Sequence, residues 1–204
     1  MSTETLAELQ EHKKALRERA HESRRKLENK DDLSRVIVEK FVSLPEYYGA
    51  KTVLFYVDVR AEVRTRFFLP TALTHGKKIV VPWCNDTGEL ELFWLRDMSD
   101  LALGMYKILE PKSELRNLPD RVVDVRDLDL IMVPGVAFDA DGARMGHGKG
   151  YYDKLLQHAR PDCPLVALAF ECQMFPMIPM QAHDIFMDKV ISESAVYQGK
   201  GRQP

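Results

Sequence analysis

The chain has 204 residues, of which 45% are hydrophobic and 29% are charged, a composition typical of one globular domain. Its formal net charge of -2 argues against nucleic acid as the main partner, because proteins that neutralise many phosphates usually have a basic excess. No apolar stretch approaches the roughly 20 residues of a membrane span, and the charged N-terminus is unlike a secretory signal. We therefore expect a cytoplasmic protein without membrane or nucleic-acid partners. Small-molecule substrates and a monomeric state are the further expectations.

Helical patterns occupy the first part of the chain. Residues 4–27 contain few helix breakers and a sparse leucine and alanine stripe, which predicts a long, mostly exposed helix within an N-terminal segment of residues 1–30. A second helix is expected to start at Asp31 or Asp32, either of which could cap it, and to stop at Pro45.

Short runs of β-branched and aromatic residues then predict strands at residues 52–57, 78–81, 90–95, 128–133, 165–170 and 190–192. Helices are expected between strands at residues 64–75 and 151–159. Because strands alternate with helices, the sequence predicts a single α/β domain of three layers, α/β/α, around a mostly parallel central sheet. Ligands of such folds bind at the carboxyl ends of the strands. Residues 199–204 are expected to be frayed.

The three cysteines, Cys84, Cys163 and Cys172, are odd in number and lack the spacing of a metal site. A disulfide framework or a zinc ribbon is therefore not expected. All three are predicted to be free thiols, mostly buried.

Residues 144–153 read Arg-Met-Gly-His-Gly-Lys-Gly-Tyr-Tyr-Asp and lie between a predicted strand and a predicted helix. The three alternating glycines are Gly146, Gly148 and Gly150. Glycines leave room for backbone N–H groups to face an anion, and Arg144 and Lys149 add positive charge. The glycine spacing fits neither the Walker A loop nor the dinucleotide fingerprint. A flexible turn is the structural alternative, but the flanking charges favour a phosphate-binding loop.

The segment resembles the signature of the 5-formyltetrahydrofolate cyclo-ligases, also called methenyltetrahydrofolate synthetases. In that signature an apolar strand, Pro-Gly, a small residue and Ala-Phe-Asp precede Arg-x-Gly-x-Gly-x-Gly-Tyr-Tyr-Asp, and residues 133–139 and 144–153 match it. Further matches lie at Lys13 with Arg17 and at residues 62–65, 108–111, 169–173 and 183–188. His147 departs from the Tyr or Arg of many relatives, and Tyr106 stands where some have Trp.

The resemblance implies an enzyme that converts 5-formyltetrahydrofolate to 5,10-methenyltetrahydrofolate while ATP becomes ADP and phosphate. A formamide oxygen is a poor leaving group, so its phosphorylation must precede ring closure by N10. Such a transfer depends on positioning and on neutralising charge rather than on a nucleophile of the protein. ATP is then the co-substrate and Mg²⁺ the cofactor.

The resemblance also assigns residues to each ligand. Lys149 and Arg144 are expected to act in catalysis. The ATP-binding residues it implies are Lys13, Arg17, Arg144, Gly146, His147, Gly148, Lys149, Gly150, Tyr151, Tyr152 and Asp153. The folate-binding residues it implies are Val57, Glu62, Tyr106 and Tyr151. Asp153 and Asp188 are expected to hold Mg²⁺, because a hard cation prefers carboxylate oxygens.

Several of these residues also have a structural interpretation. Lys13 and Arg17, one helical turn apart, could belong to a solvated helix face, and Asp153 could simply stabilise the start of its helix. His183 and Asp184 are expected to be structural, shaping the loop before Asp188.

The two adjacent tyrosines of the glycine segment cannot share a helix face, so one of them is expected to pack inward. Tyr151 is favoured over Tyr152 as the ligand contact, because a flat ring with a polar tip suits a ring system.

Three other functions compete with this interpretation. One is another ATP-dependent enzyme on the same scaffold that activates a different amide or acid. A second is a nucleic-acid-binding protein that uses the basic residues 24–26 at the end of the first helix. A third, a sugar-phosphate isomerase, rests on fold analogy alone. The length of the matched signature favours the cyclo-ligase.

Overall fold

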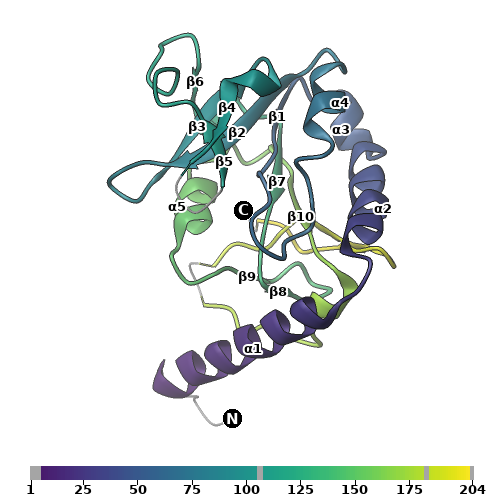
Figure 1. Cartoon of the computed structure of the whole chain (residues 1–204). Helices are drawn as coiled ribbons and strands as arrows, with labels where there is room; N and C mark the ends of the chain where they lie inside the picture. The colour runs from purple at the N-terminus through teal and green to yellow at the C-terminus, as the bar shows by residue number, and fades with distance from the viewer. Residues whose placement is uncertain (1–5, 105–107, 182–183, 203–204) are drawn as a thin grey trace.

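A computed structural model describes residues 6–104, 108–181 and 184–202 of the chain. A central sheet has helices on both faces, and one long helix crosses an end of the molecule (Figure 1). The α-helices are α1 (Leu6–Lys26), α2 (Lys30–Val42), α3 (Pro45–Gly49), α4 (Leu69–Leu73) and α5 (Tyr151–Gln157). The strands of the large sheet are β1 (Thr52–Leu54), β2 (Lys78–Cys84), β3 (Leu90–Leu95), β6 (Val122–Val123), β7 (Leu130–Val133), β10 (Leu165–Leu168), β11 (Lys189–Ile191) and β12 (Val196–Gln198).

The large sheet has the strand order β12-β11-β10-β7-β1-β2-β3-β6. The strands from β11 to β2 are parallel, whereas β12, β3 and β6 are antiparallel to their neighbours, so the mostly parallel sheet is confirmed. At the centre, Val53 of β1 is paired with Ile79 on one side and Leu130 on the other. The chain leaves β1 toward β2 but leaves β7 toward β10, which creates a topological switch point between β1 and β7.

Alternating apolar side chains build a core on each face of the sheet, which confirms the three-layer fold. On one face, Val53 and Met132 belong to a cluster that includes residues of α2, α3 and α4. On the other face, Leu54 and Ile131 join a cluster with Leu156 of α5. Figure 1 shows α2 to α4 and α5 on opposite sides of the strands. Each fully buried aliphatic side chain contributes about 1.5–3 kcal/mol to this packing.

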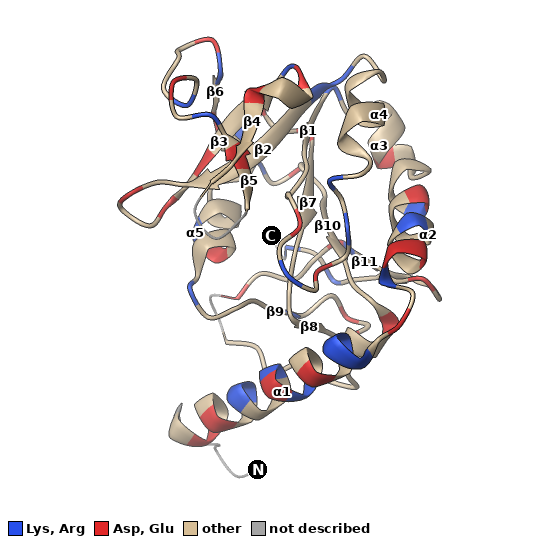
Figure 2. Cartoon of the chain, viewed as in Figure 1, with Lys and Arg blue, Asp and Glu red and all other residues tan. Residues whose placement is uncertain are grey.

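Helix α1 lies across the loops at the carboxyl ends of the strands and packs there through its sparse apolar stripe (Figure 1). Leu16 and Ala20 belong to a third buried cluster with Val136 and Met145. Arg24 is also buried, and its Nη1 donates to the carbonyl oxygen of Gly135 at 3.3 Å. Figure 2 shows basic and acidic residues interspersed along α1. The basic residues 24–26 therefore do not form a continuous exposed surface for nucleic acid.

Two short hairpins lie outside the large sheet and were not predicted from the sequence. They pair β4 (Leu101–Leu103) with β5 (Leu109–Pro111) and β8 (Ala137–Phe138) with β9 (Arg144–Met145). Strands of two or three residues give too short an alternation to be detected in a sequence. No helix among the described residues has the length and apolar character to cross a membrane.

The helix predicted at residues 64–75 is largely wrong, because α4 covers only Leu69–Leu73. The carboxylate of Asp58 accepts hydrogen bonds from the backbone N–H groups of Thr65 and Arg66, each at 2.9 Å. Side-chain capture of backbone donors competes with helix formation, so the chain turns here before the helix begins. The start of α2 also differs: Asn29 is the N-cap, while the two predicted capping aspartates lie in the first turn.

The predicted fraying of residues 199–204 is wrong for residues 199–202, the part that the structure describes. The N–H of Gly199 donates to the carbonyl of Asp188, and that of Lys200 donates to Asp141. A Cβ at Gly199 would lie 2.0 Å from the carbonyl oxygen of Met187, so glycine permits this close approach. Of the cysteines, Cys163 is buried, but Cys84 is exposed, which corrects the expectation for that thiol.

Candidate active site

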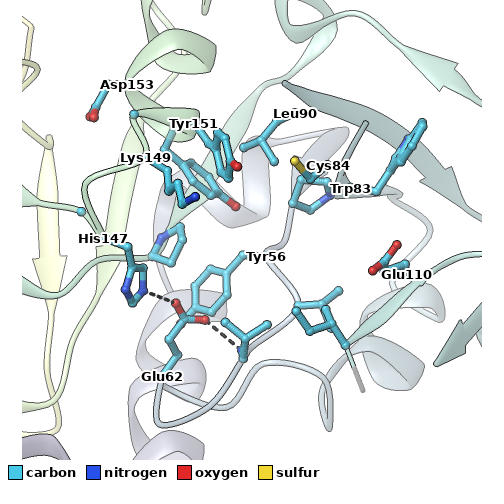
Figure 3. A pocket seen from close by; sticks show the side chains of 18 of the residues that line it. Tyr56, Glu62, Trp83, Cys84, Leu90, Glu110, His147, Lys149, Tyr151 and Asp153 are labelled. Atoms are coloured by element: carbon cyan, nitrogen blue, oxygen red, sulfur yellow. Dashed lines mark hydrogen bonds and ion pairs between the residues drawn. The ribbon is translucent and has the colours of Figure 1, made fainter. Parts of the chain in front are cut away.

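A cavity of about 290 Å³ opens at the carboxyl ends of β1, β2 and β7, next to the topological switch point. We call it the apolar cavity, because its walls are mostly hydrophobic and aromatic. Its apolar lining includes Tyr56, Trp83, Leu90, Leu109, Tyr151 and Tyr152. Glu62, Lys149 and Glu110 are among the charged residues at the same cavity (Figure 3). Such a mixture suits a flat ring system that has a few polar groups.

A second cavity of about 160 Å³ lies on the other side of the glycine loop. We call it the polar cavity. It is lined by Lys13, Arg17, Arg144, Met145, Gly146, Gly148, Gly150, Asp153, Ile178, Pro179 and Asp184. The structure thus brings the predicted pair on α1 to the glycine loop, although more than a hundred residues separate them in the sequence. Because Lys13 and Arg17 line a cavity, they are not an ordinary solvated helix face.

The glycine loop forms the wall between the two cavities. All three glycines line the polar cavity, and Gly146 and Gly150 border the apolar cavity as well, whereas the intervening His147 and Lys149 line the apolar cavity and not the polar one. Gly148 has a φ of +94° and Gly150 of +71°, a left-handed conformation that favours glycine. The alternation of glycine with larger residues therefore directs the side chains of His147 and Lys149 to the apolar cavity and leaves glycine backbone along the polar cavity.

Ion pairs and hydrogen bonds hold the polar cavity together. Nζ of Lys13 lies 3.0 Å from Oδ2 of Asp184, and the same carboxylate oxygen accepts a 2.8 Å hydrogen bond from the N–H of Gln181. Nε of Arg17 donates to the carbonyl oxygen of Gly146 at 3.0 Å. Both contacts tie α1 to the loops around the cavity.

Arg144 is buried between the two cavities, where two contacts fix its guanidinium group. Its Nη1 donates to the carbonyl of Pro134 at 3.0 Å, and its Nη2 donates to Oδ1 of Asp153. The Arg144 side chain is 4% exposed, against 46% for Asp153. The guanidinium therefore orients the Asp153 carboxylate at the border of both cavities.

The two carboxylates predicted to share magnesium are not brought together. Asp188 lies directly before β11, and its Oδ2 accepts from the N–H of Leu165 at the start of β10, which places it at the amino ends of these strands. Asp153 lies at the opposite ends, in the first turn of α5. Asp184, expected to be structural, also lines the polar cavity with Asp153. His183 is outside the described residues.

The ammonium group of Lys149 projects into the apolar cavity toward Tyr151 (Figure 3). Among the described residues it has no ion pair or hydrogen bond. A cation without a protein partner in a cavity is available to a ligand. Lys149 also comes from the loop that borders the polar cavity, so its charge lies close to the boundary between the two.

Glu62 is 5% exposed, and both oxygens of its carboxylate accept hydrogen bonds. The N–H of Val59 donates to Oε2 at 2.9 Å, and Nε2 of His147 lies 3.1 Å from Oε1 (Figure 3). Val57 borders the same cavity. Tyr106, the other predicted folate contact, lies outside the described residues.

The two tyrosines of the glycine loop differ in their packing, and one of them points into the core as expected. Tyr152 packs against both large core clusters, and burial raises the pKa of its phenol. Its hydroxyl is buried without a hydrogen-bond partner in the part of the chain that is described. Tyr151 lies next to Cys84, and a hydrogen bond with that thiol raises the pKa of Tyr151. Tyr151 is therefore the more accessible of the two rings.

Sequence reasoning missed three contributors to the cavities: Trp83, Glu110 and Asp184. Trp83 faces the guanidinium of Arg116, which lies 4.6 Å from the ring centroid and forms a 2.8 Å ion pair with Glu110. A tryptophan near the end of a predicted strand was the available signal, since ligands bind at strand ends. Glu110 and Asp184 both lay in matched segments without an assigned ligand.

Comparisons with known proteins show which family the chain is similar to. The model of the family described as "5-formyltetrahydrofolate cyclo-ligase family" matches residues 9–193. A Schizosaccharomyces pombe protein named probable 5-formyltetrahydrofolate cyclo-ligase is 33% identical, with 81% of this chain and 86% of the relative covered. The mouse 5-formyltetrahydrofolate cyclo-ligase is 29% identical over 79% of this chain and 83% of its own. The solved structure of Aquifex aeolicus 5,10-methenyltetrahydrofolate synthetase is 32% identical, has a TM-score of 0.79, and is matched over 94% of this chain and 95% of its own.

Proposed function

The chain belongs to the 5-formyltetrahydrofolate cyclo-ligase family, a family of ligases, and we propose that it uses ATP and Mg²⁺ to convert 5-formyltetrahydrofolate to 5,10-methenyltetrahydrofolate. One observation carries the ATP-dependent mechanism. A glycine loop separates a polar cavity that contains Lys13 and Arg17 from an apolar cavity that contains Lys149. Two dissimilar ligands can thus meet across one short segment of chain.

The polar cavity is the proposed site of the ATP phosphates. The backbone of the three glycines faces it, and the cations of Lys13 and Arg17 line it. Backbone N–H groups and basic side chains are the usual partners of phosphate oxygens. The partly exposed Arg17, already anchored on Gly146, needs little reorganisation to add a hydrogen bond to a phosphate.

The apolar cavity is the proposed site of the reduced folate. Trp83, Leu90 and Tyr151 offer the flat and aliphatic surfaces that a pterin ring requires. The carboxylate of Glu62 can accept hydrogen bonds from N–H donors of the ring, because each of its oxygens has more than one lone pair. A ring held at Glu62 would direct its formyl group toward the glycine loop.

The chemistry then needs no nucleophile from the protein. The formyl oxygen attacks the γ-phosphorus of ATP, a new P–O bond forms, and the bond to ADP breaks. N10 next attacks the activated carbon and loses its proton, and phosphate leaves with the former formyl oxygen. The ammonium of Lys149, which projects into the folate cavity from the loop that would hold the phosphates, can neutralise charge on the phosphoryl group during its transfer.

Asp153 and Asp184 are the residues that would hold magnesium. Both carboxylates line the polar cavity, and Mg²⁺ is usually bound by one or two carboxylates together with substrate phosphates and water. Among the described residues, no group of three or more His, Cys, Asp or Glu side chains could hold a metal alone, which fits an ion delivered with the nucleotide. When bound, the ion would neutralise phosphate charge.

The direct test is the absorbance of the methenyl product after the protein is mixed with 5-formyltetrahydrofolate, ATP and Mg²⁺. We expect a rise that requires both ATP and the metal. ATP hydrolysis without this rise would favour a different amide or acid as substrate, and the absence of both would refute the proposal. We also propose a cytoplasmic location and a monomeric state, and size-exclusion chromatography tests the monomeric state.

A further inference from the structure

His147 points away from the nucleotide side of the glycine loop. Its side chain lines the apolar cavity, and its Nε2 lies 3.1 Å from Oε1 of Glu62, 85 positions earlier in the chain. The polar cavity is lined by the glycines on either side of it, Gly146 and Gly148. We propose that His147 is a positioning residue that orients the Glu62 carboxylate toward the folate, rather than an ATP ligand. This inference rests on the proposed function.

The hydrogen-bond inventory defines what His147 does. An ionised carboxylate only accepts hydrogen bonds, so Nε2 of His147 must carry the proton that it shares with Glu62. The N–H of Val59 donates to the other oxygen at 2.9 Å. Two donors, one on each oxygen, hold the Glu62 carboxylate in one orientation. Lone pairs remain on both oxygens for a ligand with adjacent N–H groups.

A second histidine supports the ring of His147 from helix α1. The rings of His21 and His147 stack with centroids 5.6 Å apart and an interplanar angle of 29°. Nη2 of the buried Arg24 lies 3.4 Å from Nδ1 of His21, and a guanidinium can only donate. Burial and then the neighbouring Arg24 lower the pKa of His21, which favours a neutral ring in the stack. The helix that lines the polar cavity thus also steadies the residue that orients Glu62.

Two substitutions of similar size separate the hydrogen bond from packing. His147→Leu removes the donor, so of the hydrogen bonds among the described residues Glu62 keeps only that from the N–H of Val59, and its carboxylate can rotate. We expect the KM for 5-formyltetrahydrofolate to rise about tenfold, since a hydrogen bond to a charged group contributes substantially to binding. The KM for ATP should change less than about twofold, because the phosphate side of the loop is unaltered. His147→Gln retains an N–H donor at similar reach and should recover most of the folate affinity.

The matched control is His158→Leu, which makes the same change at an exposed histidine that follows α5. His21→Ala should raise the folate KM in the same direction but by less. Combined with His147→Leu, it should add little, because both act through the orientation of Glu62.

Steady-state kinetics with each substrate varied in turn decide the matter. A rise in the ATP KM of His147→Leu with an unchanged folate KM would return His147 to the nucleotide site. Equal losses for both leucine and glutamine variants would show that the ring matters only for packing. If the wild type forms no methenyl product, the proposed function fails, and equilibrium binding of 5-formyltetrahydrofolate to wild type and His147→Leu still tests this inference. Equal affinities would then overturn it.

Discussion

Lys13 and Asp184 form an ion pair of 3.0 Å between helix α1 and the loop before β11, 171 positions apart in the chain. Both side chains are less than one fifth exposed and line the polar cavity. If the cavity binds ATP with magnesium, phosphate oxygens attract Lys13 while the metal attracts Asp184. The ion pair therefore holds both side chains in place before the ligands bind. Binding would replace the contact between Lys13 and Asp184 with one contact from Lys13 to a phosphate and one from Asp184 to the metal.

We predict that Lys149→Ala lowers kcat by about 10²–10³, because removing one preorganised charge at a reacting oxyanion has effects of this size. Lys154→Ala is the matched control. Lys154 is an exposed lysine of α5 that lines neither of the two cavities, and its loss should leave turnover within about twofold. Methenyl product formation with saturating ATP measures both. Near-normal turnover of the Lys149 variant would remove it from the mechanism.

For the metal, we predict that Asp184→Asn raises the magnesium concentration needed for half-maximal activity, because a neutral amide binds a hard cation more weakly than a carboxylate. Asp188→Asn should leave the magnesium titration unchanged. It should instead lower stability, because the Asp188 carboxylate accepts from the Leu165 backbone at 2.7 Å. A shifted titration for Asp188 and an unshifted one for Asp184 would reverse this assignment.

A third prediction concerns Gly142, which has a φ of +87° and whose Cβ would lie 2.4 Å from the carbonyl oxygen of Met187. Gly142→Ala should lower the free energy of unfolding by about 3 kcal/mol or more, because a backbone atom cannot move aside as a side-chain tip can. Gly76→Ala isolates the backbone strain, since Gly76 has a φ of +70° and open space around it. Its cost should be about 1 kcal/mol. Urea denaturation measures both variants. Equal losses of unfolding free energy for Gly142→Ala and Gly76→Ala would show that the contact between the new Cβ and the carbonyl of Met187 relaxes.

The fourth prediction concerns pH. Burial tends to raise the pKa of Asp58, but hydrogen bonds from the side chain and backbone of Arg66 and from the backbone of Thr65 outweigh it, so the pKa lies below its ordinary 3.8. The ionised form is therefore favoured in the folded state. Its contribution to stability is complete above about pH 5 and is lost as the pH falls below about 4 toward the folded-state pKa.

Asp58→Asn should consequently be less stable than wild type at pH 7 by about 1–3 kcal/mol. The difference should shrink as the pH is lowered from about 5 to 3, because only the wild type loses this carboxylate. Urea denaturation at several pH values measures it, with the exposed Asp32→Asn as control. A difference that stays constant with pH would mean that Asp58 stabilises the loop independently of its charge.

Strong local patterns in the sequence predicted their elements well. Residues 90–95 alternate clearly and form β3 over the predicted range, and the long polar helix is α1. Where side chains capture the backbone, local patterns misled: Asp58 holds the N–H groups of Thr65 and Arg66 and prevents the predicted crossover helix from starting there. Such a contact depends on the path of the loop, which no local period encodes.

For the candidate site too, some features could be predicted from the sequence and others depended on the fold. The sequence by itself determined the glycine loop, its charges, and the pairing of Lys13 with Arg17 at one helical turn, because these are features of neighbouring residues. Only the tertiary structure decided that His147 faces Glu62, that Arg144 is buried against Asp153, and that Asp184 rather than Asp188 lines the polar cavity. The physical reason is that strand order and loop direction determine which end of the sheet a side chain reaches. Residues four positions apart can thus lie at opposite ends of the strands.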